Sequence, residues 1–127
     1  MTAKDPLIFL EHILENISDI EKFSKGKDKE ILKNDIMRQK AIIRSIEVIG
    51  EAVRNLPVSF TKDNPEVPWS NIIGMKNKLT HHYFGIDFDI VWKVIEKDIP
   101  DLKKKIKDIR EDLIIRKKQI ENEKNKK

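Results

Sequence analysis

One short stretch of the chain gathers the side chains best suited to acid–base and phosphate chemistry. Residues 75–85 read MKNKLTHHYFG and hold two of the three histidines and the only tyrosine, among basic side chains. Histidine accepts or releases a proton near neutral pH, and lysine carries a compact positive charge that can face a phosphate. We therefore expect any chemistry of this protein to take place here.

The residues around this stretch predict that it lies on a short helix. Pro68 is a favourable first residue for a helix, and Gly85 is a favourable stop. At about 100° per residue, Lys76 and His81 would then point about 140° apart, so one regular helix cannot aim both at a single small group. Either the helix loosens near its end, or a second copy of the chain supplies the missing half across a two-fold axis.

These side chains suit the cleavage of RNA without a metal. RNA has a 2′-hydroxyl beside each phosphate, so such a nuclease needs a base for that proton and a cation for the growing negative charge. We predict His81 as the base, Lys76 as the phosphate-binding cation and Asn77 as a hydrogen-bond donor. A metal site is not predicted, because His81 and His82 diverge on a helix and no cysteine or carboxylate at helical spacing joins them.

The same stretch resembles the Arg-x-x-x-x-His-x-Tyr signature of HepT, the toxin of HEPN/minimal nucleotidyltransferase toxin–antitoxin pairs. Lys76 stands where the signature has arginine, and His81 and Tyr83 match its other two positions. Beyond the signature, the resemblance extends over nearly the whole chain. It includes Asp5-Pro6, residues 49–52, Pro68-Trp69 and residues 73–75, 83–87, 90–92 and 98–100.

The resemblance implies an all-α, up-and-down bundle of four to five helices that forms a homodimer. It also implies a toxin that cleaves RNA as a metal-independent endoribonuclease, with a composite site at the dimer interface. In that site His81 and Lys76 are expected to be catalytic. From the residues themselves, we expect Asn77, beside Lys76, and Glu51, beside Gly50, to be supporting polar residues. No cofactor is expected for the ribonuclease itself.

In HepT-like toxins the tyrosine of the signature receives AMP groups from the partner nucleotidyltransferase. That antitoxin uses ATP and Mg²⁺, and the modification silences the toxin. The resemblance therefore implies that Tyr83 is an AMPylation site. AMP on a phenol beside Lys76 would add negative charge and bulk where an RNA phosphate binds, so it would block the cleft.

The lysine at position 76 leaves a second function open. Arginine presents a planar fork that suits two phosphate oxygens, whereas lysine offers one charge on a flexible stem. Cleavage would then be weak, or the protein would be a non-cleaving HEPN binding module that partners a nucleotidyltransferase. Without the resemblance, the residues also fit a helical bundle whose histidines and lysines simply cover its surface.

Composition favours a single helical domain in the cytoplasm. The chain has 127 residues, of which 39% are hydrophobic and 38% charged, with four glycines, five prolines and no cysteine. No apolar run approaches the roughly 20 residues that cross a bilayer, and no basic segment precedes an apolar one near residue 1. The net charge of +4 is compatible with an RNA or acidic partner without requiring one.

Apolar residues at three- and four-residue spacings predict the helices. The first begins at Asp5-Pro6 and runs to about Phe23, and the last restarts at Asp98-Ile99-Pro100. The bundle domain is expected to span residues 1–115, and residues 116–127 to form a charged, frayed tail. Between the first and last helices, a longer helix follows Asp28 and ends at Pro57, residues 57–68 form a loop, and another helix follows Asp87.

Gly50 interrupts the longest predicted helix. A glycine inside a helix costs about 1 kcal/mol relative to alanine, so its presence calls for a physical reason. One interpretation is that it permits the close approach of another helix. The other is that it places Glu51 near residues 75–85.

Overall fold

Helices account for most of the fold, as the sequence predicts. The computed structural model describes residues 5–81 and 85–125, and of His81 it describes the backbone alone. The helices are α1 (Pro6–Ser24), α2 (Lys29–Lys33), α3 (Ile36–Asn55), α4 (Val58–Asp63), α5 (Trp69–Leu79), α6 (Phe88–Lys93), the π-helical turn η1 (Val94–Asp98) and α7 (Ile99–Asn125). Two short strands, β1 (Thr80–His81) and β2 (Gly85–Ile86), follow α5.

The start of α1 agrees with its sequence. The Asp5 side chain accepts a hydrogen bond from the Leu7 N–H at 3.0 Å, and Pro6 is the first helical residue. A capping carboxylate satisfies an N–H that has no partner within the helix, and proline has no N–H to satisfy. The helix buries a single face, formed by Leu10, Ile13, Ile17 and Ile20.

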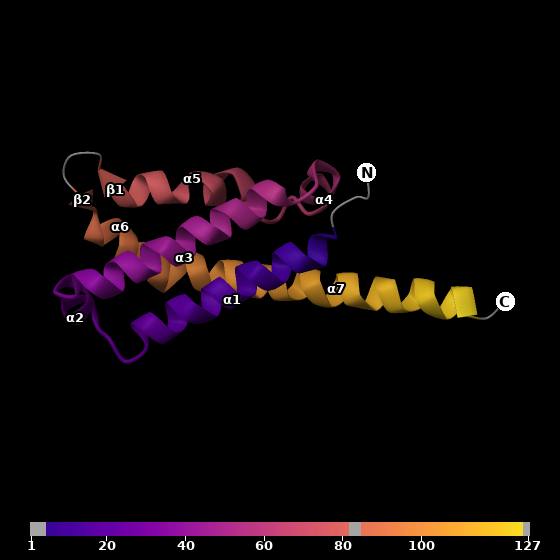
Figure 1. Ribbon diagram of the computed structural model, residues 1–127, viewed down its shortest axis with the longest axis horizontal. Coiled ribbons are helices and arrows are strands. Elements are labelled where there is room, and N and C mark those ends of the chain that lie inside the picture. The colour runs from indigo at the N-terminus through magenta and orange to yellow at the C-terminus, as the bar shows by residue number, and fades with distance from the viewer. Residues whose placement is uncertain (1–4, 82–84, 126–127) are drawn as a thin grey trace.

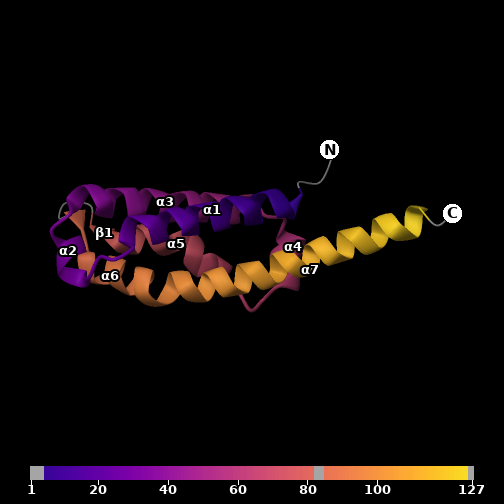
Figure 2. The ribbon, with the colours of Figure 1, turned by 90° about the horizontal axis from the view of Figure 1, so that it is seen from below.

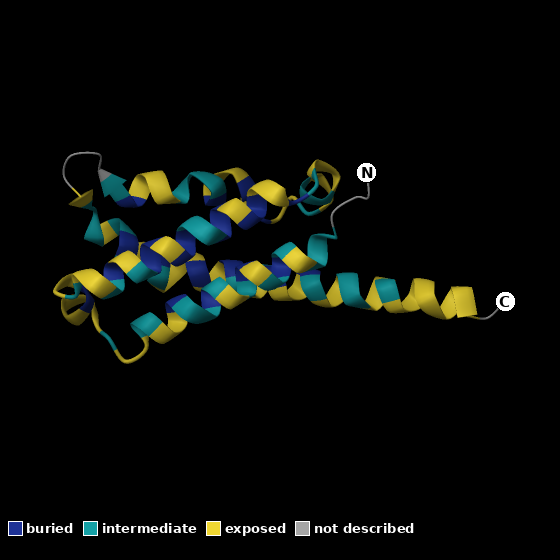
Figure 3. Cartoon of the chain, viewed as in Figure 1, coloured by how far each residue is buried: buried dark blue, intermediate teal, exposed yellow. Residues whose placement is uncertain are grey.

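α3 lies at the centre of the fold. It packs along α1 and along α5, α7 lies against α1, and these four helices run in alternating directions (Figure 1). Figure 3 shows buried residues along these contacts and exposed residues on the outer faces. The predicted all-α class is therefore confirmed, whereas the homodimer stays a prediction. Fully buried side chains of the core include Leu32, Ile42, Ile46, Ile49, Leu79, Val91 and Ile106.

α7 extends past the ends of the other helices (Figure 2). Three ion pairs among the described residues join it to α1 or to the N-cap of α1: Lys103 with Glu21 at 2.9 Å, Arg110 with Glu11 at 2.6 Å, and Lys117 with Asp5. Residues 116–125 continue the helix, and nearly all of their side chains are exposed. The charged segment is thus helical as far as Asn125, and its fraying stays a prediction.

The prediction of one long helix after Asp28 is wrong near its start, because the chain forms two helices there, α2 and α3. Asp35 caps α3 by accepting a hydrogen bond from the Arg38 N–H at 3.0 Å. Gln39 is buried, and its amide donates to two carbonyls at the end of α2, that of Leu32 at 2.6 Å and that of Lys33 at 3.0 Å. These bonds satisfy backbone groups that helix ends leave without partners, so the break is tolerated.

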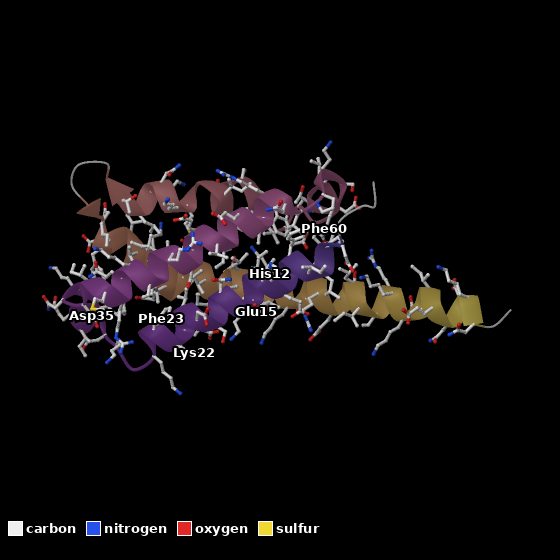
Figure 4. All side chains as sticks on the ribbon, viewed as in Figure 1. His12, Glu15, Lys22, Phe23, Asp35 and Phe60 are labelled. Atoms are coloured by element: carbon white, nitrogen blue, oxygen red, sulfur yellow. The ribbon has the colours of Figure 1, made fainter. Side chains whose placement is uncertain are left out.

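The loop predicted at residues 57–68 contains a short helix, α4, just beyond the end of α3. Trp69 anchors this connection. Its indole N–H donates to the Asn64 carbonyl at 3.0 Å, and its ring centre lies 6.3 Å from that of Phe60. Figure 4 labels Phe60 near this end of α3 and Asp35 near the other.

The final helix, α7, begins at Ile99, as the sequence predicts, but no break precedes it, because α6, η1 and α7 follow one another directly. Pro100 has no N–H, and its ring would crowd the carbonyl four residues earlier in a regular helix. The backbone adopts a π-helical turn over Val94–Asp98 instead, in which the Ile99 N–H donates to the Val94 carbonyl. The helix therefore widens before the proline and does not end there.

Gly50 lets α3 pack closely against α5, as the first of its two interpretations predicts. A Cβ added at Gly50 would lie 3.5 Å from the Ile72 carbonyl oxygen and 3.6 Å from that of Ile73, which is ordinary van der Waals contact. A side chain longer than a methyl group would run into the α5 backbone. A Cβ added at Gly74, which lies on α5 itself, would have no neighbouring atom of the described residues within 4 Å.

This difference predicts opposite outcomes for leucine at the two glycines. Gly50→Leu should lower the free energy of unfolding by about 1–3 kcal/mol, because it overpacks the α3–α5 contact. Gly74→Leu should leave that free energy unchanged or raise it by up to about 1 kcal/mol, because leucine is the better helix former. Urea unfolding followed by circular dichroism measures both, and equal effects would contradict close packing at Gly50.

Candidate active site

α5 ends earlier than the sequence predicts. Thr80 is extended, with φ −128° and ψ 140°, and His81 pairs with Gly85 where β1 and β2 run antiparallel. A β-branched residue favours a strand, and Gly85 supplies the positive φ of 78°. The Asp87 N–H donates a hydrogen bond to the Leu79 carbonyl at 2.7 Å. The predicted helix through Gly85 is therefore wrong, and His81 lies in a strand.

This correction removes one argument for a second chain. The angle of about 140° between Lys76 and His81 assumes that both lie on one regular helix. The backbone leaves the helix between them, after Leu79. Helical geometry therefore no longer requires a second copy, and the dimeric site depends on the family resemblance.

Three of the predicted site residues surround one pocket. Lys76 and Asn77 of α5 and Glu51 of α3 line a shallow pocket of about 170 Å³ between the two helices. The second interpretation of Gly50, which places Glu51 beside residues 75–85, is thus compatible with the first. The other lining residues are Ile46, Glu47, Gly50, Arg54 and Ile73.

The other predicted residues follow α5 in the chain. His81 is the second residue after the helix, in β1. His82, which was expected to diverge from His81, and Tyr83, the expected AMPylation site, fall outside the described residues. A larger pocket, of about 300 Å³, lies on another face of α5 against α6 and α7, and Lys76, Asn77 and Glu51 do not line it.

Glu47 is the direct partner of Lys76 in the pocket. The Lys76 Nζ lies 3.1 Å from one carboxylate oxygen of Glu47, and an Arg44 guanidinium nitrogen lies 2.9 Å from the other. The hydrogen bond from Lys76, together with the charges of Lys76 and Arg44, holds the pKa of the Glu47 carboxyl below its ordinary value. Glu47 is therefore ionised at neutral pH, and the Lys76 ammonium is held at the wall of the pocket.

The sequence carries a signal for this cluster that lies outside the family signature. Arg44, Glu47, Glu51 and Arg54 are spaced by three, four and three residues, which places all four on one face of α3. Glu47 and Arg54 line the pocket beside Glu51. A charged face of this kind usually indicates solvent exposure, and only the packing of α5 shows that it also forms a pocket wall.

Two further kinds of site are absent from the part of the chain that the structure describes. Within residues 5–81 and 85–125, no group of three or more histidine, cysteine, aspartate or glutamate side chains is placed to hold a metal ion. No helix among these residues is long and apolar enough to span a membrane. The pocket between α3 and α5 is lined by cations, an amide and carboxylates, a set that can bind a phosphate and assist proton transfer.

The lowered pKa of Glu47 gives a test of the pair. The folded-state pKa lies below the ordinary value of 4.5, so the pair contributes stability above that pH and loses it as the pH falls through the folded value. Lys76→Gln should raise the Glu47 pKa back toward 4.5, because it removes the largest cause of the shift. Carboxyl ¹³C NMR titration measures this, with Lys78→Gln as the matched control, and equal pKa values in the two variants would contradict the pair.

Comparison with known proteins identifies the family. A family model described as ribonuclease HepT-like matches residues 13–109, well over half of the chain. A relative from Methanocaldococcus jannaschii, named a "Putative RNase", is 43% identical over 113 residues, which cover 89% of this chain and 93% of the relative. A "Putative RNase" from Caldanaerobacter subterraneus subsp. tengcongensis is 43% identical over 106 residues, covering 84% of this chain and 95% of the relative.

A third relative carries the family name. The "Probable ribonuclease HepT" of Thermococcus cleftensis is 42% identical over 102 residues, which cover 80% of this chain and 93% of the relative. No solved structure gives a significant match. The family model and these relatives show that the chain belongs to the HepT-like ribonuclease family.

Proposed function

We propose that this protein is the toxin of a HEPN/minimal nucleotidyltransferase pair and that it cleaves RNA as a metal-independent endoribonuclease. The observation that carries the proposal is the pocket between α3 and α5, where Lys76, Asn77 and Glu51 lie together in a chain of the HepT-like ribonuclease family. Relatives about 40% identical to the chain are named ribonucleases.

The proposed reaction starts at the 2′-hydroxyl of the RNA. His81 takes its proton, and the 2′ oxygen forms a bond to the adjacent phosphorus while the bond from phosphorus to the 5′ oxygen breaks. The 5′ oxygen leaves with a proton from water, so the products are a 2′,3′-cyclic phosphate and a 5′-hydroxyl. Lys76 balances the negative charge that grows on the phosphate oxygens, and Asn77 donates a hydrogen bond to it.

The active form in this proposal is a homodimer in which His81 of one chain and Lys76 of the other act on the same phosphate. The support is the family resemblance, together with the position of the strand-bearing end of α5 at one end of the molecule (Figure 1). A surface at the end of a bundle is open to a second copy and to a long substrate. Residues from two chains would then complete one site.

The nucleotidyltransferase partner would control the toxin through Tyr83. This residue follows His81 by two positions, so an AMP group on it lies close in sequence to the proposed base. The phosphate of the AMP group would compete with RNA for the Lys76 ammonium, and its nucleoside would occupy space that the RNA needs. ATP and Mg²⁺ belong to the partner's reaction, and the cleavage step uses neither.

One observation favours the second candidate function, a HEPN module that binds RNA or its partner without cutting. Lys76 replaces the arginine of the signature, and its ammonium is already paired with Glu47 at 3.1 Å. A compact charge that a carboxylate partly neutralises stabilises a transition state less than a free guanidinium does. The two functions differ in whether RNA is cleaved.

Cleavage in EDTA tests the proposal. Wild-type protein should cut single-stranded RNA in the presence of EDTA and leave 2′,3′-cyclic phosphate ends, and His81→Ala should lower the rate by about 100-fold or more because the base is lost. His12→Ala is the matched control. This exposed histidine of α1 has its ring centre 6.4 Å from that of Phe9, and it does not line the pocket, so its loss should leave the rate unchanged.

The outcomes separate the two functions. Cleavage that persists in His81→Ala would contradict the proposed base. No cleavage by wild type, combined with a stable complex with a nucleotidyltransferase, would support the binding module. Lys76→Arg in the same assay should raise the rate, because a guanidinium contacts two phosphate oxygens at once, and an unchanged or lower rate would count against the role of this position.

Modification of Tyr83 is a separate prediction. Incubation with the cognate nucleotidyltransferase, ATP and Mg²⁺ should add AMP to Tyr83 and abolish RNA cleavage, because the adduct blocks the phosphate site. Intact-mass and peptide mass spectrometry locate the adduct, and Tyr83→Phe should remain unmodified. AMP on another residue, or none, would refute this part of the proposal.

A further inference from the structure

Among the described residues, Arg54 is the cation of the pocket that forms no ion pair. The two cations that line the pocket are Lys76 and Arg54. Lys76 is paired with Glu47 at 3.1 Å, whereas no carboxylate lies within ion-pair distance of Arg54 among the described residues. The guanidinium is therefore available to an anion that enters the pocket.

The carboxylates near Arg54 do not compete strongly for it. Glu47 is already held by Lys76 and by Arg44, so its charge is balanced by two cations. Glu51 lines the pocket three residues before Arg54, and its side chain is exposed to solvent, which screens its charge. These two carboxylates therefore reduce the attraction of Arg54 for an anionic ligand only weakly.

Arg54 and Lys76 lie at different places along the pocket. Arg54 follows Glu47 by seven residues, which is about 10 Å along a helix axis, and Glu47 is the residue that contacts Lys76. Gly50 lies between them on α3 and has no side chain to fill the floor of the pocket. A strand of RNA that crosses this floor would present one phosphate to Lys76 and a neighbouring phosphate to Arg54.

We propose that Arg54 binds a phosphate of the RNA strand adjacent to the one that is cleaved, and that it supplies much of the affinity for substrate. This inference depends on the proposed ribonuclease function. A guanidinium binds phosphate through two parallel hydrogen bonds, and it acts equally on bound substrate and on the transition state when the phosphate it holds does not react. Arg54 therefore lowers KM and leaves kcat nearly unchanged, whereas Lys76 acts on kcat.

Binding to a non-cleavable RNA tests this role. The probe is a fluorescein-labelled single strand with 2′-O-methyl riboses, which lacks the attacking hydroxyl, and fluorescence anisotropy measures its Kd at several salt concentrations. Arg54→Gln should weaken binding by about 5- to 10-fold and reduce the slope of log K against log salt by about 0.7, the value for one lost phosphate contact with a single strand. Arg54→Lys should recover part of the affinity, because it keeps the charge and loses the fork.

Arg116→Gln is the matched control. Arg116 is also exposed on a helix, pairs with Asp112 at 2.9 Å on α7 and does not line the pocket. Its loss changes the net charge by the same amount as Arg54→Gln, so it should change Kd by less than about 2-fold if binding requires a pocket contact and not overall charge alone. Circular dichroism melts of all variants confirm that the exposed substitutions leave the fold intact.

Steady-state cleavage of the matching unmodified RNA provides the second measurement. Arg54→Gln should raise KM about 5- to 10-fold and change kcat by less than about 2-fold, whereas Lys76→Gln should lower kcat. A fall in kcat with constant KM for Arg54→Gln would contradict binding of a non-reacting phosphate.

The outcomes distinguish this inference from the function on which it depends. If wild type binds and cleaves RNA but Arg54→Gln behaves like Arg116→Gln, the inference is wrong and the ribonuclease proposal stands. If both substitutions weaken binding equally, overall charge or α7 explains the affinity, and the inference is again overturned. If wild type neither binds nor cleaves RNA, both proposals fail together.

Discussion

The packing of α3 against α5 is the constraint on which the candidate site depends. Gly50 has no side chain, so the carbonyls of Ile72 and Ile73 lie where the atoms of a longer residue would be. This close contact brings the charged face of α3 to the end of α5 that carries Lys76 and Asn77. A larger spacing between the helices would separate Glu47 from Lys76, and the pocket would lose one wall.

The charges of the pocket are arranged so that one cation is held and one is available. Glu47 keeps Lys76 at the α3 wall and is itself held by Arg44. Such a pair fixes the position of the ammonium, at the cost of part of its attraction for a phosphate. Arg54 has no such partner among the described residues, and together with Lys76 it forms a surface that suits an RNA backbone better than either residue alone. Under the proposed function, this asymmetry assigns substrate binding to Arg54 and charge stabilisation to Lys76.

Local sequence signals predicted the elements that depend on them. The capping of α1 by Asp5 and its apolar face were readable because every interaction involved lies within a few residues. The break between α2 and α3 was not, since it depends on a buried Gln39 that bonds to carbonyls six and seven residues earlier. Asp98-Ile99-Pro100 predicts the start of α7, but it does not predict that η1 joins α6 to α7 without a break, because nothing local shows that the backbone can widen before a proline.

In the candidate site, too, the sequence predicts only the features that depend on neighbouring residues. The family signature marks Lys76, Asn77 is predicted because it is a hydrogen-bond donor beside Lys76, and Glu51 is predicted because it follows an unusual glycine. Glu47 and Arg54 lie more than twenty positions from Lys76 in the sequence and join it only through tertiary packing. Periodicity places them on one face of α3, and it does not say which helix covers that face. The early end of α5 is not predictable locally, because it depends on the pairing of β1, which contains Thr80, with β2, which contains Gly85.

The central claim is that RNA binds in the pocket between α3 and α5. NMR titration of ¹⁵N-labelled protein with the 2′-O-methyl strand tests it most directly, because backbone amide shifts report where the ligand lies. The account predicts the largest shifts at Gly50, Ile73 and Asn77, which line the pocket. Shifts confined to residues 116–125 of α7, or to the larger pocket between α5 and α7, would contradict it.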